Sequence, residues 1–157
     1  MVKKLVAILF ALVFAVSCQS KSGSDMSGNV GGGGANATPG SEADLVHNVG
    51  DRVFFDLDSS SLSSESQATL TRQAAWLKNF STHAVTVEGH CDERGTREYN
   101  LALGARRAES AKKFLVRSGI ESSRVHTISY GKERPAEVGT GESVWSLNRR
   151  AVTVVNK

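Results

Sequence analysis

Residues 45–157 predict an α/β sandwich in which one mixed sheet of about four strands is covered by two helices. Two observations support this fold class. Runs of β-prone residues alternate with two long segments whose apolar residues recur at helical spacing, which gives the order β-α-β-α-β-β. This part of the chain also has the mixture of apolar, aromatic and charged residues that can bury a core, whereas the residues before it do not.

The first strand and the first helix are expected near the start of this region. Residues 52–58 form a short β-prone run that ends in a cluster of serines. Ser63 or Ser64 is a suitable N-cap for the helix that follows, and Glu65 falls in its first turn. The apolar residues of this helix recur at i, i+4 and i+7 and therefore share one face: Leu70, Ala74 and Leu77.

A second strand and a longer helix follow. Residues 83–89 alternate apolar and polar side chains, which indicates a strand with one buried face. The polar residues after this strand include Gly95 and predict a loop. The second helix is expected over residues 98–118, with Gly119 at its C-terminal end. Its apolar stripe consists of Leu101, Ala105, Ala108, Ala111 and Leu115.

Two more strands complete the predicted sheet. Residues 125–130 form the third strand, and the β-branched residues of 151–155 form the fourth. Between them, the segment 131–142 contains Pro135, Gly139 and Gly141 and is expected to be a long loop.

The N-terminal residues have the pattern of a secretory signal. Lys3 and Lys4 precede an unbroken apolar run, residues 5–16, and small residues follow it. The run is shorter than the roughly 20 residues that a helix needs to cross a bilayer. We therefore predict that residues 1–17 are a signal peptide that is removed on export.

The end of this signal predicts a lipid anchor. Ala15-Val16-Ser17-Cys18 resembles the lipobox of bacterial lipoproteins, in which the cysteine becomes the acylated first residue. The resemblance implies that Cys18 carries the acyl chains and, because Gln19 follows rather than Asp, that the chain is sorted to the outer membrane. Residues 18–44 are rich in Gly and Ser and are expected to form a flexible tether.

The chain has two cysteines, which leaves one alternative to lipidation. An exported protein with two cysteines often contains one disulfide, and a Cys18–Cys91 bridge would tie the tether to the domain. If Cys18 is acylated, Cys91 is instead a lone thiol. The mass of the N-terminal peptide distinguishes the two states.

The charge of the chain argues against a nucleic-acid partner. The formal net charge of +3 falls close to zero once Lys3 and Lys4 leave with the signal peptide. A protein of nearly neutral charge has no strong non-specific attraction to a polyanion.

His90-Cys91-Asp92-Glu93-Arg94 is the densest group of reactive side chains in the sequence. Consecutive residues that leave a strand point in alternating directions and do not converge on a metal ion, so we expect neither a metal nor a cofactor. No residue is placed to orient a Cys–His nucleophilic pair, and neighbouring carboxylates on one loop do not flank a sugar ring. We therefore expect no enzymatic activity.

A binding site for a zwitterion suits the same region better. Asp58 ends one predicted strand, Asp92 follows another, and Arg106 and Arg107 lie on the helix after that loop. If these elements border one cleft, a carboxylate can hold an ammonium group while a guanidinium clamps a carboxylate. The alternative is that these charges form surface salt bridges of little energetic value.

Several blocks of the sequence closely resemble the OmpA-like peptidoglycan-binding domain. They are Phe54-Phe55-Asp56-Leu57-Asp58, Thr86-Val87-Glu88-Gly89-His90-Cys91-Asp92-Glu93-Arg94-Gly95-Thr96, Tyr99-Asn100, Leu103-Gly104-Ala105-Arg106-Arg107-Ala108, Ser129-Tyr130-Gly131-Lys132-Glu133-Arg134-Pro135 and Asn148-Arg149-Arg150-Ala151-Val152. They cover nearly all of residues 45–157. The Asp-Glu-Arg-Gly-Thr loop, the lipobox and the short tether are most similar to the lipidated branch of that family, the peptidoglycan-associated lipoproteins.

The resemblance implies non-covalent binding of the peptidoglycan stem peptide through its diaminopimelate residue. By motif position, Asp92 and Arg107 hold the charged groups of that residue. The acid after the first strand of the family corresponds to Asp58, and an apolar contact on the helix corresponds to Leu103. The zwitterion argument and the resemblance therefore select the same residues.

The resemblance also implies how the protein works and with which partners. Acyl chains hold one end of the chain in the outer membrane, and the domain, facing the periplasm, binds the cell wall. The Tol system is implied as a partner, including its periplasmic β-propeller protein, which competes with the wall and assists constriction of the outer membrane at cell division. The alternatives are a protein–protein adaptor without affinity for the wall and a cell-wall hydrolase.

Overall fold

A computed structural model describes residues 37–156 of the chain. The predicted signal peptide, Cys18 and most of the predicted tether lie outside the described residues. The elements in chain order are α1 (Glu42–Asp44), a π-helical turn η1 (Leu45–Val49), β1 (Arg52–Phe54), α2 (Ser64–Asn79), β2 (Val85–His90), α3 (Arg97–Arg117), a 3₁₀ turn η2 (Ser122–Arg124), β3 (Val125–Gly131), α4 (Glu142–Asn148) and β4 (Arg150–Val155).

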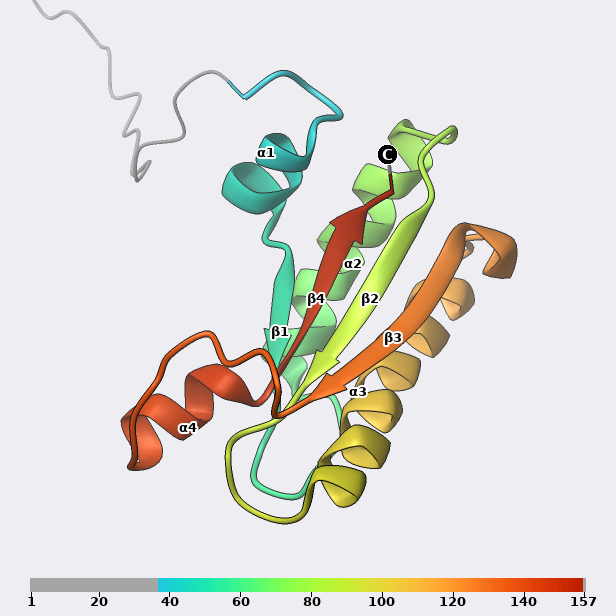
Figure 1. The fold of residues 1–157 in the computed structure, drawn as a ribbon. Helices are drawn as coiled ribbons and strands as arrows, with labels where there is room; N and C mark the ends of the chain where they lie inside the picture. The colour runs from blue at the N-terminus through green and yellow to red at the C-terminus, as the bar shows by residue number, and fades with distance from the viewer. Residues whose placement is uncertain (1–36, 157) are drawn as a thin grey trace, which may run out of the picture. The chain divides into compact units, whose positions relative to one another are not determined.

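The four strands form one mixed sheet in the order β1-β4-β2-β3. β4 runs antiparallel to both of its neighbours, β1 and β2, whereas β2 and β3 are parallel. β1, β2 and β3 therefore run in the same direction and end at the same edge of the sheet. α2 and α3 cover one face of the sheet (Figure 1), so the predicted fold class is confirmed.

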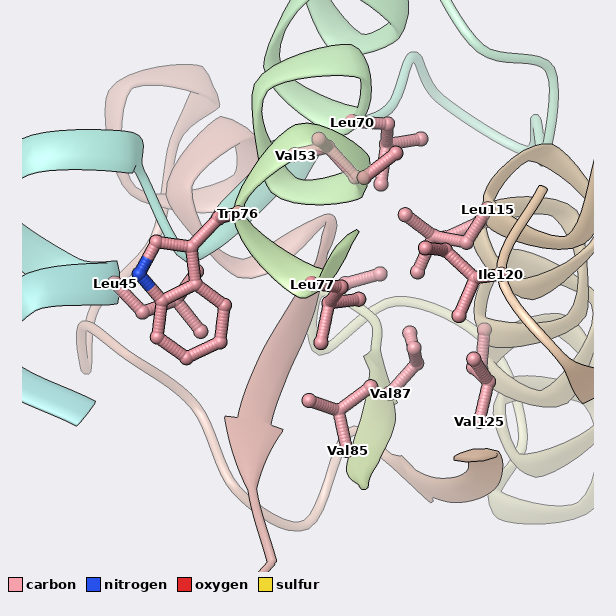
Figure 2. Packing of buried hydrophobic residues seen from close by; sticks show 14 of the residues in the cluster. Leu45, Val53, Leu70, Trp76, Leu77, Val85, Val87, Leu115, Ile120 and Val125 are labelled. Atoms are coloured by element: carbon pink, nitrogen blue, oxygen red, sulfur yellow. The ribbon is translucent and has the colours of Figure 1, made fainter. Parts of the chain in front are cut away.

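The core lies between these two helices and the sheet. Its buried side chains come from α2, α3 and every strand (Figure 2). The apolar residues predicted to share one face of the first helix, Leu70, Ala74 and Leu77, are all buried. None of the helices in the described part of the chain combines the length and the apolar character needed to cross a membrane.

The two long helices begin close to where the sequence predicts. The Ser63 hydroxyl accepts a hydrogen bond from the Ser66 amide at the start of α2, and the Thr96 hydroxyl does the same for the Tyr99 amide at the start of α3. Gly119 follows the end of α3 with a φ of +93°, a left-handed conformation that glycine adopts without strain.

The predicted apolar stripe of the second helix is wrong at its start, because Leu101 and Ala105 are exposed and Leu103 and Gly104 are buried instead. Three other local features differ from the sequence predictions. β1 ends at Phe54, four residues earlier than expected, because the chain turns at Leu57 and Asp58, where Asp58 has a φ of +54°. α4 occupies a segment that had not been predicted as a helix. Its N-cap is Gly141, which has no side chain to mark the start.

The third difference is a helical turn, α1, within the segment that we assigned to the tether. Ser41 caps this turn, and the Asp44 carboxylate accepts a 2.8 Å hydrogen bond from the Trp76 indole of α2. Leu45 is completely buried beside Trp76 (Figure 2). Contacts with the domain therefore begin a few residues before position 45.

A close approach of two backbones fixes α3 against β2. A Cβ atom added to Gly89 would lie 1.9 Å from the carbonyl oxygen of Gly104, and one added to Gly104 would lie 2.4 Å from the Ser129 hydroxyl. Only residues without a side chain permit this packing. The contact sets the start of α3 next to the loop that follows β2.

Candidate functional site

A cleft of about 270 Å³ lies at the edge of the sheet where β1 and β2 end. It is enclosed by the turn after β1, the loop after β2 and the first turns of α3. The four residues predicted to bind peptidoglycan, Asp58, Asp92, Leu103 and Arg107, all line it. The remaining lining residues are Leu57, Cys91, Arg94, Gly95, Tyr99 and Asn100. The parallel direction of β1 and β2 explains why Asp58 and Asp92 meet there.

A larger hollow of about 440 Å³ lies beside β1, the start of α2 and α4. Its two guanidinium groups already have carboxylate partners: Arg52 contacts Asp51, and Arg149 contacts Asp92 and Glu142. The smaller cleft is therefore the better candidate for a charged ligand, because it contains an exposed carboxylate, Asp58, and a guanidinium, Arg107, that has no carboxylate partner among the described residues.

Arg107 forms the buried inner wall of the cleft. Its side chain has no exposed surface, and it donates hydrogen bonds to three backbone carbonyls: 2.8 Å to Ser59, 2.9 Å to His90 and 3.1 Å to Asp56. Among the described residues, no carboxylate lies within 4.0 Å of it. Burial lowers the pKa of Arg107 from its ordinary value. The guanidinium therefore joins the turn after β1 to the end of β2, and it leaves part of its donor capacity unused.

Asp92 is also buried, with 5% of its surface exposed, and both of its carboxylate oxygens accept hydrogen bonds. Oδ1 accepts hydrogen bonds from the backbone amide of Arg94 at 3.1 Å and from its Nε at 3.2 Å. Oδ2 accepts from Nη2 of Arg94 at 2.5 Å and from Nη1 of Arg149 at 3.4 Å. Burial alone would raise the pKa of Asp92, but these hydrogen bonds lower it below its ordinary value.

α4 supplies an outer set of contacts to this loop. The Arg94 guanidinium lies 4.0 Å from the centre of the Trp145 ring, and the Trp145 indole donates a 2.9 Å hydrogen bond to Glu93. Arg149 bridges Asp92 and Glu142 and also donates to the Phe55 carbonyl. Sequence reasoning assigned no role to Trp145, Arg149 or Glu142. Two features of the sequence could have indicated these contacts: the Asn148-Arg149-Arg150 block and the single tryptophan in a polar segment, Trp145.

The rim of the cleft is more exposed. The Tyr99 hydroxyl donates a hydrogen bond to the Asp58 carboxylate, which raises the pKa of Tyr99. Leu57 is 59% exposed and lies at the entrance of the cleft. Leu103 is only 5% exposed and forms an apolar surface inside it. A ligand thus meets an exposed carboxylate before it reaches the deeper charges.

The loop after β2 is held by its own hydrogen bonds. The buried Asn100 amide donates to the carbonyls of Arg94 and Thr96, and the Lys132 ammonium donates to those of Glu93 and Gly95. The Cys91 thiol is buried beneath the loop and lies 3.3 Å from the Asn100 carbonyl, and burial raises its pKa. Cys18, the other half of the alternative disulfide, lies outside the described residues.

His90 lies directly under this loop. It is 2% exposed, and neither of its ring nitrogens has a hydrogen-bond partner within the described structure. Burial and the nearby guanidinium of Arg150 lower its pKa to about 4, so the ring is neutral at pH 7. Across residues 37–156, no three His, Cys, Asp or Glu side chains are grouped as a metal ion would require.

Comparison with known proteins agrees with the motifs. Residues 54–149 match the model of the OmpA family. The peptidoglycan-associated lipoprotein of Agrobacterium fabrum is 54% identical over 152 residues, which cover 96% of this chain and 86% of that protein. The protein of the same name from Pseudomonas aeruginosa is 41% identical over 158 residues, with 94% and 93% coverage.

Solved structures show the same architecture. The crystal structure of the peptidoglycan-associated lipoprotein from Burkholderia pseudomallei matches with a TM-score of 0.66 and 40% identity, over 68% of this chain and 90% of that one. The C-terminal domain of Helicobacter pylori MotB, at 19% identity over 68% of this chain and 84% of that one, has a TM-score of 0.63 and shares the fold. The chain therefore belongs to the OmpA family and, within it, to the peptidoglycan-associated lipoproteins.

Proposed function

We propose that this protein is an outer-membrane lipoprotein that binds peptidoglycan non-covalently and so tethers the outer membrane to the cell wall. The ligand is the diaminopimelate of the stem peptide, whose free end carries an ammonium and a carboxylate on one carbon atom. The observation that carries this proposal is the gathering of Asp58, Asp92, Leu103 and Arg107 around one small cleft. The protein acts by binding and does no chemistry on the wall.

The cleft suits a zwitterion because it offers opposite charges a short distance apart. The carboxylates of Asp58 and Asp92 are acceptors for the ammonium. The Arg107 guanidinium, buried in the inner wall of the cleft, adds a positive charge there without a carboxylate partner among the described residues, which favours a ligand carboxylate. Leu103 provides an apolar surface for the methylene chain between the two ends of diaminopimelate.

The placement of the N-terminal segment is consistent with a tether. α1, where the described chain enters the domain, lies at the start of β1, whereas the cleft lies at the opposite end of the sheet (Figure 1). With an acylated Cys18 at the end of a long segment before α1, the cleft would be free to reach the cell wall. Because the lipid anchor keeps the domain near the wall, a domain that dissociates meets peptidoglycan at a high effective concentration and binds it again.

We further propose that the Tol system, including its periplasmic β-propeller protein, is a partner and that the protein assists outer-membrane constriction at division. Support for this part comes from the sequence resemblance. Leu57, Tyr99 and Leu101 are exposed apolar side chains at or next to the cleft, where a competing protein could contact them.

Co-sedimentation of the full chain with purified sacculi tests wall binding. The variants are Asp92→Asn and Asp58→Asn, and the matched control is Glu98→Gln, an exposed carboxylate in the first turn of α3 that lies outside the cleft. Loss of a desolvated charge partner costs roughly 2–5 kcal/mol. We therefore expect Asp92→Asn to weaken binding at least tenfold, while the control binds as the unmodified chain does.

Two results would point to the alternatives. A folded chain that does not co-sediment with sacculi would favour a protein–protein adaptor. Release of soluble muropeptides from the sacculi would favour a hydrolase. Retention of full affinity by Asp92→Asn and Asp58→Asn would refute the site proposed here.

A further inference from the structure

The Asp92 carboxylate has no free position for a ligand. A carboxylate offers about four acceptor sites on its two oxygens. Arg94 occupies three of them, at 3.1, 3.2 and 2.5 Å, and Arg149 approaches the fourth at 3.4 Å. An ammonium group can therefore bind Asp92 directly only if one guanidinium moves away.

Arg94 is the guanidinium that can move. The Arg149 side chain is 7% exposed and is also held by the Phe55 carbonyl and the Glu142 carboxylate. The Arg94 side chain is 33% exposed and lines the cleft itself. Arg94 can keep contacts after leaving Asp92, because its guanidinium already lies over the Trp145 ring and 4.0 Å from the Glu142 carboxylate.

We propose that Arg94 determines the specificity of the cleft by exchanging ion pairs with the ligand. The ligand ammonium replaces the Arg94 guanidinium on Asp92, and the released guanidinium binds the carboxylate on the same carbon of the ligand. One internal pair is thereby exchanged for two pairs with the ligand. This inference rests on the proposed function and adds a residue that acts on both charges of diaminopimelate.

The exchange explains how a zwitterion is selected over a ligand with a single charge. A lysine side chain supplies an ammonium for Asp92 but no carboxylate for Arg94, which keeps only its contacts with the Trp145 ring and the exposed Glu142. A ligand with only a carboxylate would leave Asp92 without its Arg94 partner in a buried position. Removing one partner of a buried ion pair is strongly unfavourable. Only a ligand that carries both charges gives Asp92 and Arg94 each a new partner.

Calorimetric titration of the full chain with soluble disaccharide tripeptides tests the exchange. The three ligands carry meso-diaminopimelate, its form amidated at the free carboxylate, or lysine at the third position. The variant is Arg94→Gln. The matched control is Arg97→Gln, an exposed arginine nearby that pairs with Glu133 and does not line the cleft.

The unmodified chain is expected to prefer the diaminopimelate ligand over the lysine ligand at least tenfold, and so is the Arg97→Gln control. Arg94→Gln is expected to bind the lysine ligand more tightly than the unmodified chain does, because the ligand ammonium no longer has to displace a guanidinium from Asp92. Diaminopimelate is spared the same displacement but loses its pair with Arg94, so its affinity should change much less. The preference for diaminopimelate over lysine should therefore fall severalfold. The amidated ligand should behave as the lysine ligand does.

The lysine ligand also reports on folding, because a variant with a collapsed cleft would lose both ligands together. Equal loss of both ligands in Arg94→Gln would overturn the exchange and assign Arg94 a purely structural role. An unchanged preference in Arg94→Gln would also overturn it. If the unmodified chain binds neither these ligands nor sacculi, the proposed function itself fails.

Discussion

Arg107 should stabilise the domain strongly, whatever its part in ligand binding. It donates to the carbonyls of Ser59, His90 and Asp56, which lie 48, 17 and 51 residues away in the chain. Hydrogen bonds to a charged group contribute about 1.5–3 kcal/mol each. Their sum is partly offset because an alanine variant no longer has to desolvate a guanidinium. Each buried carbonyl that loses its partner costs about 1–3 kcal/mol before this offset.

With three such carbonyls, and after the offset, Arg107→Ala is expected to lower the free energy of unfolding by about 3–5 kcal/mol. For a domain of this size the melting temperature should fall by about 4 °C per kcal/mol, or roughly 12–20 °C in all. Urea and thermal unfolding followed by circular dichroism measure both quantities. Arg106→Ala is the control, because Arg106 is the exposed neighbour on the same helix and its loss should change stability by less than about 0.5 kcal/mol.

A loss below about 1 kcal/mol in Arg107→Ala would refute this reasoning, because it would mean that the three carbonyls find other partners at little cost. The prediction also affects the wall-binding assay. Failure of an Arg107 variant to bind sacculi identifies a ligand contact only at a temperature where that variant is shown to be folded. For this reason Asp92 and Asp58 are the better positions for that assay.

Three other changes test separate parts of the structure. Gly89→Ala would place a Cβ atom 1.9 Å from the Gly104 carbonyl oxygen, so urea unfolding should show a loss of about 3 kcal/mol or more; a loss under about 1 kcal/mol would contradict the close packing. The pKa of His90 is lowered to about 4 in the folded chain, whereas in the unfolded chain it has its ordinary value near 6.5. As the pH falls below 6.5, the unfolded chain therefore takes up a proton that the folded chain does not. This residue should therefore lower the free energy of unfolding by up to about 2 kcal/mol between pH 7 and pH 5. The His90→Gln variant should not show this decrease, and an identical pH dependence of stability in both proteins would contradict the prediction. Asp44→Ala removes the acceptor for the Trp76 indole, and we expect a loss of about 1–2 kcal/mol and altered tryptophan fluorescence, whereas unchanged values would show that α1 adds little.

The alternation and periodicity of the sequence predicted most of the secondary structure. These patterns depend on backbone geometry, which repeats every two residues in a strand and every 3.6 in a helix. The predicted cap at Ser63 is equally local, because its hydroxyl satisfies an amide three residues further along the chain. α4 escaped prediction because it is short, begins after Gly141 and is held by Trp145 and Arg149, whose contacts lie in distant segments.

Membership of the OmpA family and the residues around the cleft followed from the motifs, because Asp58, Asp92 and Arg107 occupy fixed positions at strand ends and on one helix. Their environments could not be predicted in this way. An arginine is normally exposed, and only the folded chain brings three carbonyls around Arg107. The occupation of Asp92 by Arg94 and Arg149 is likewise a tertiary property, because Arg149 comes from a segment 57 residues away. The motifs thus predicted three of the charges that border the cleft, Asp58, Asp92 and Arg107, whereas Arg106 does not line it and Arg94 does. Which of these charges are already paired follows only from the folded chain, because pairing depends on distances between segments that are far apart in the sequence.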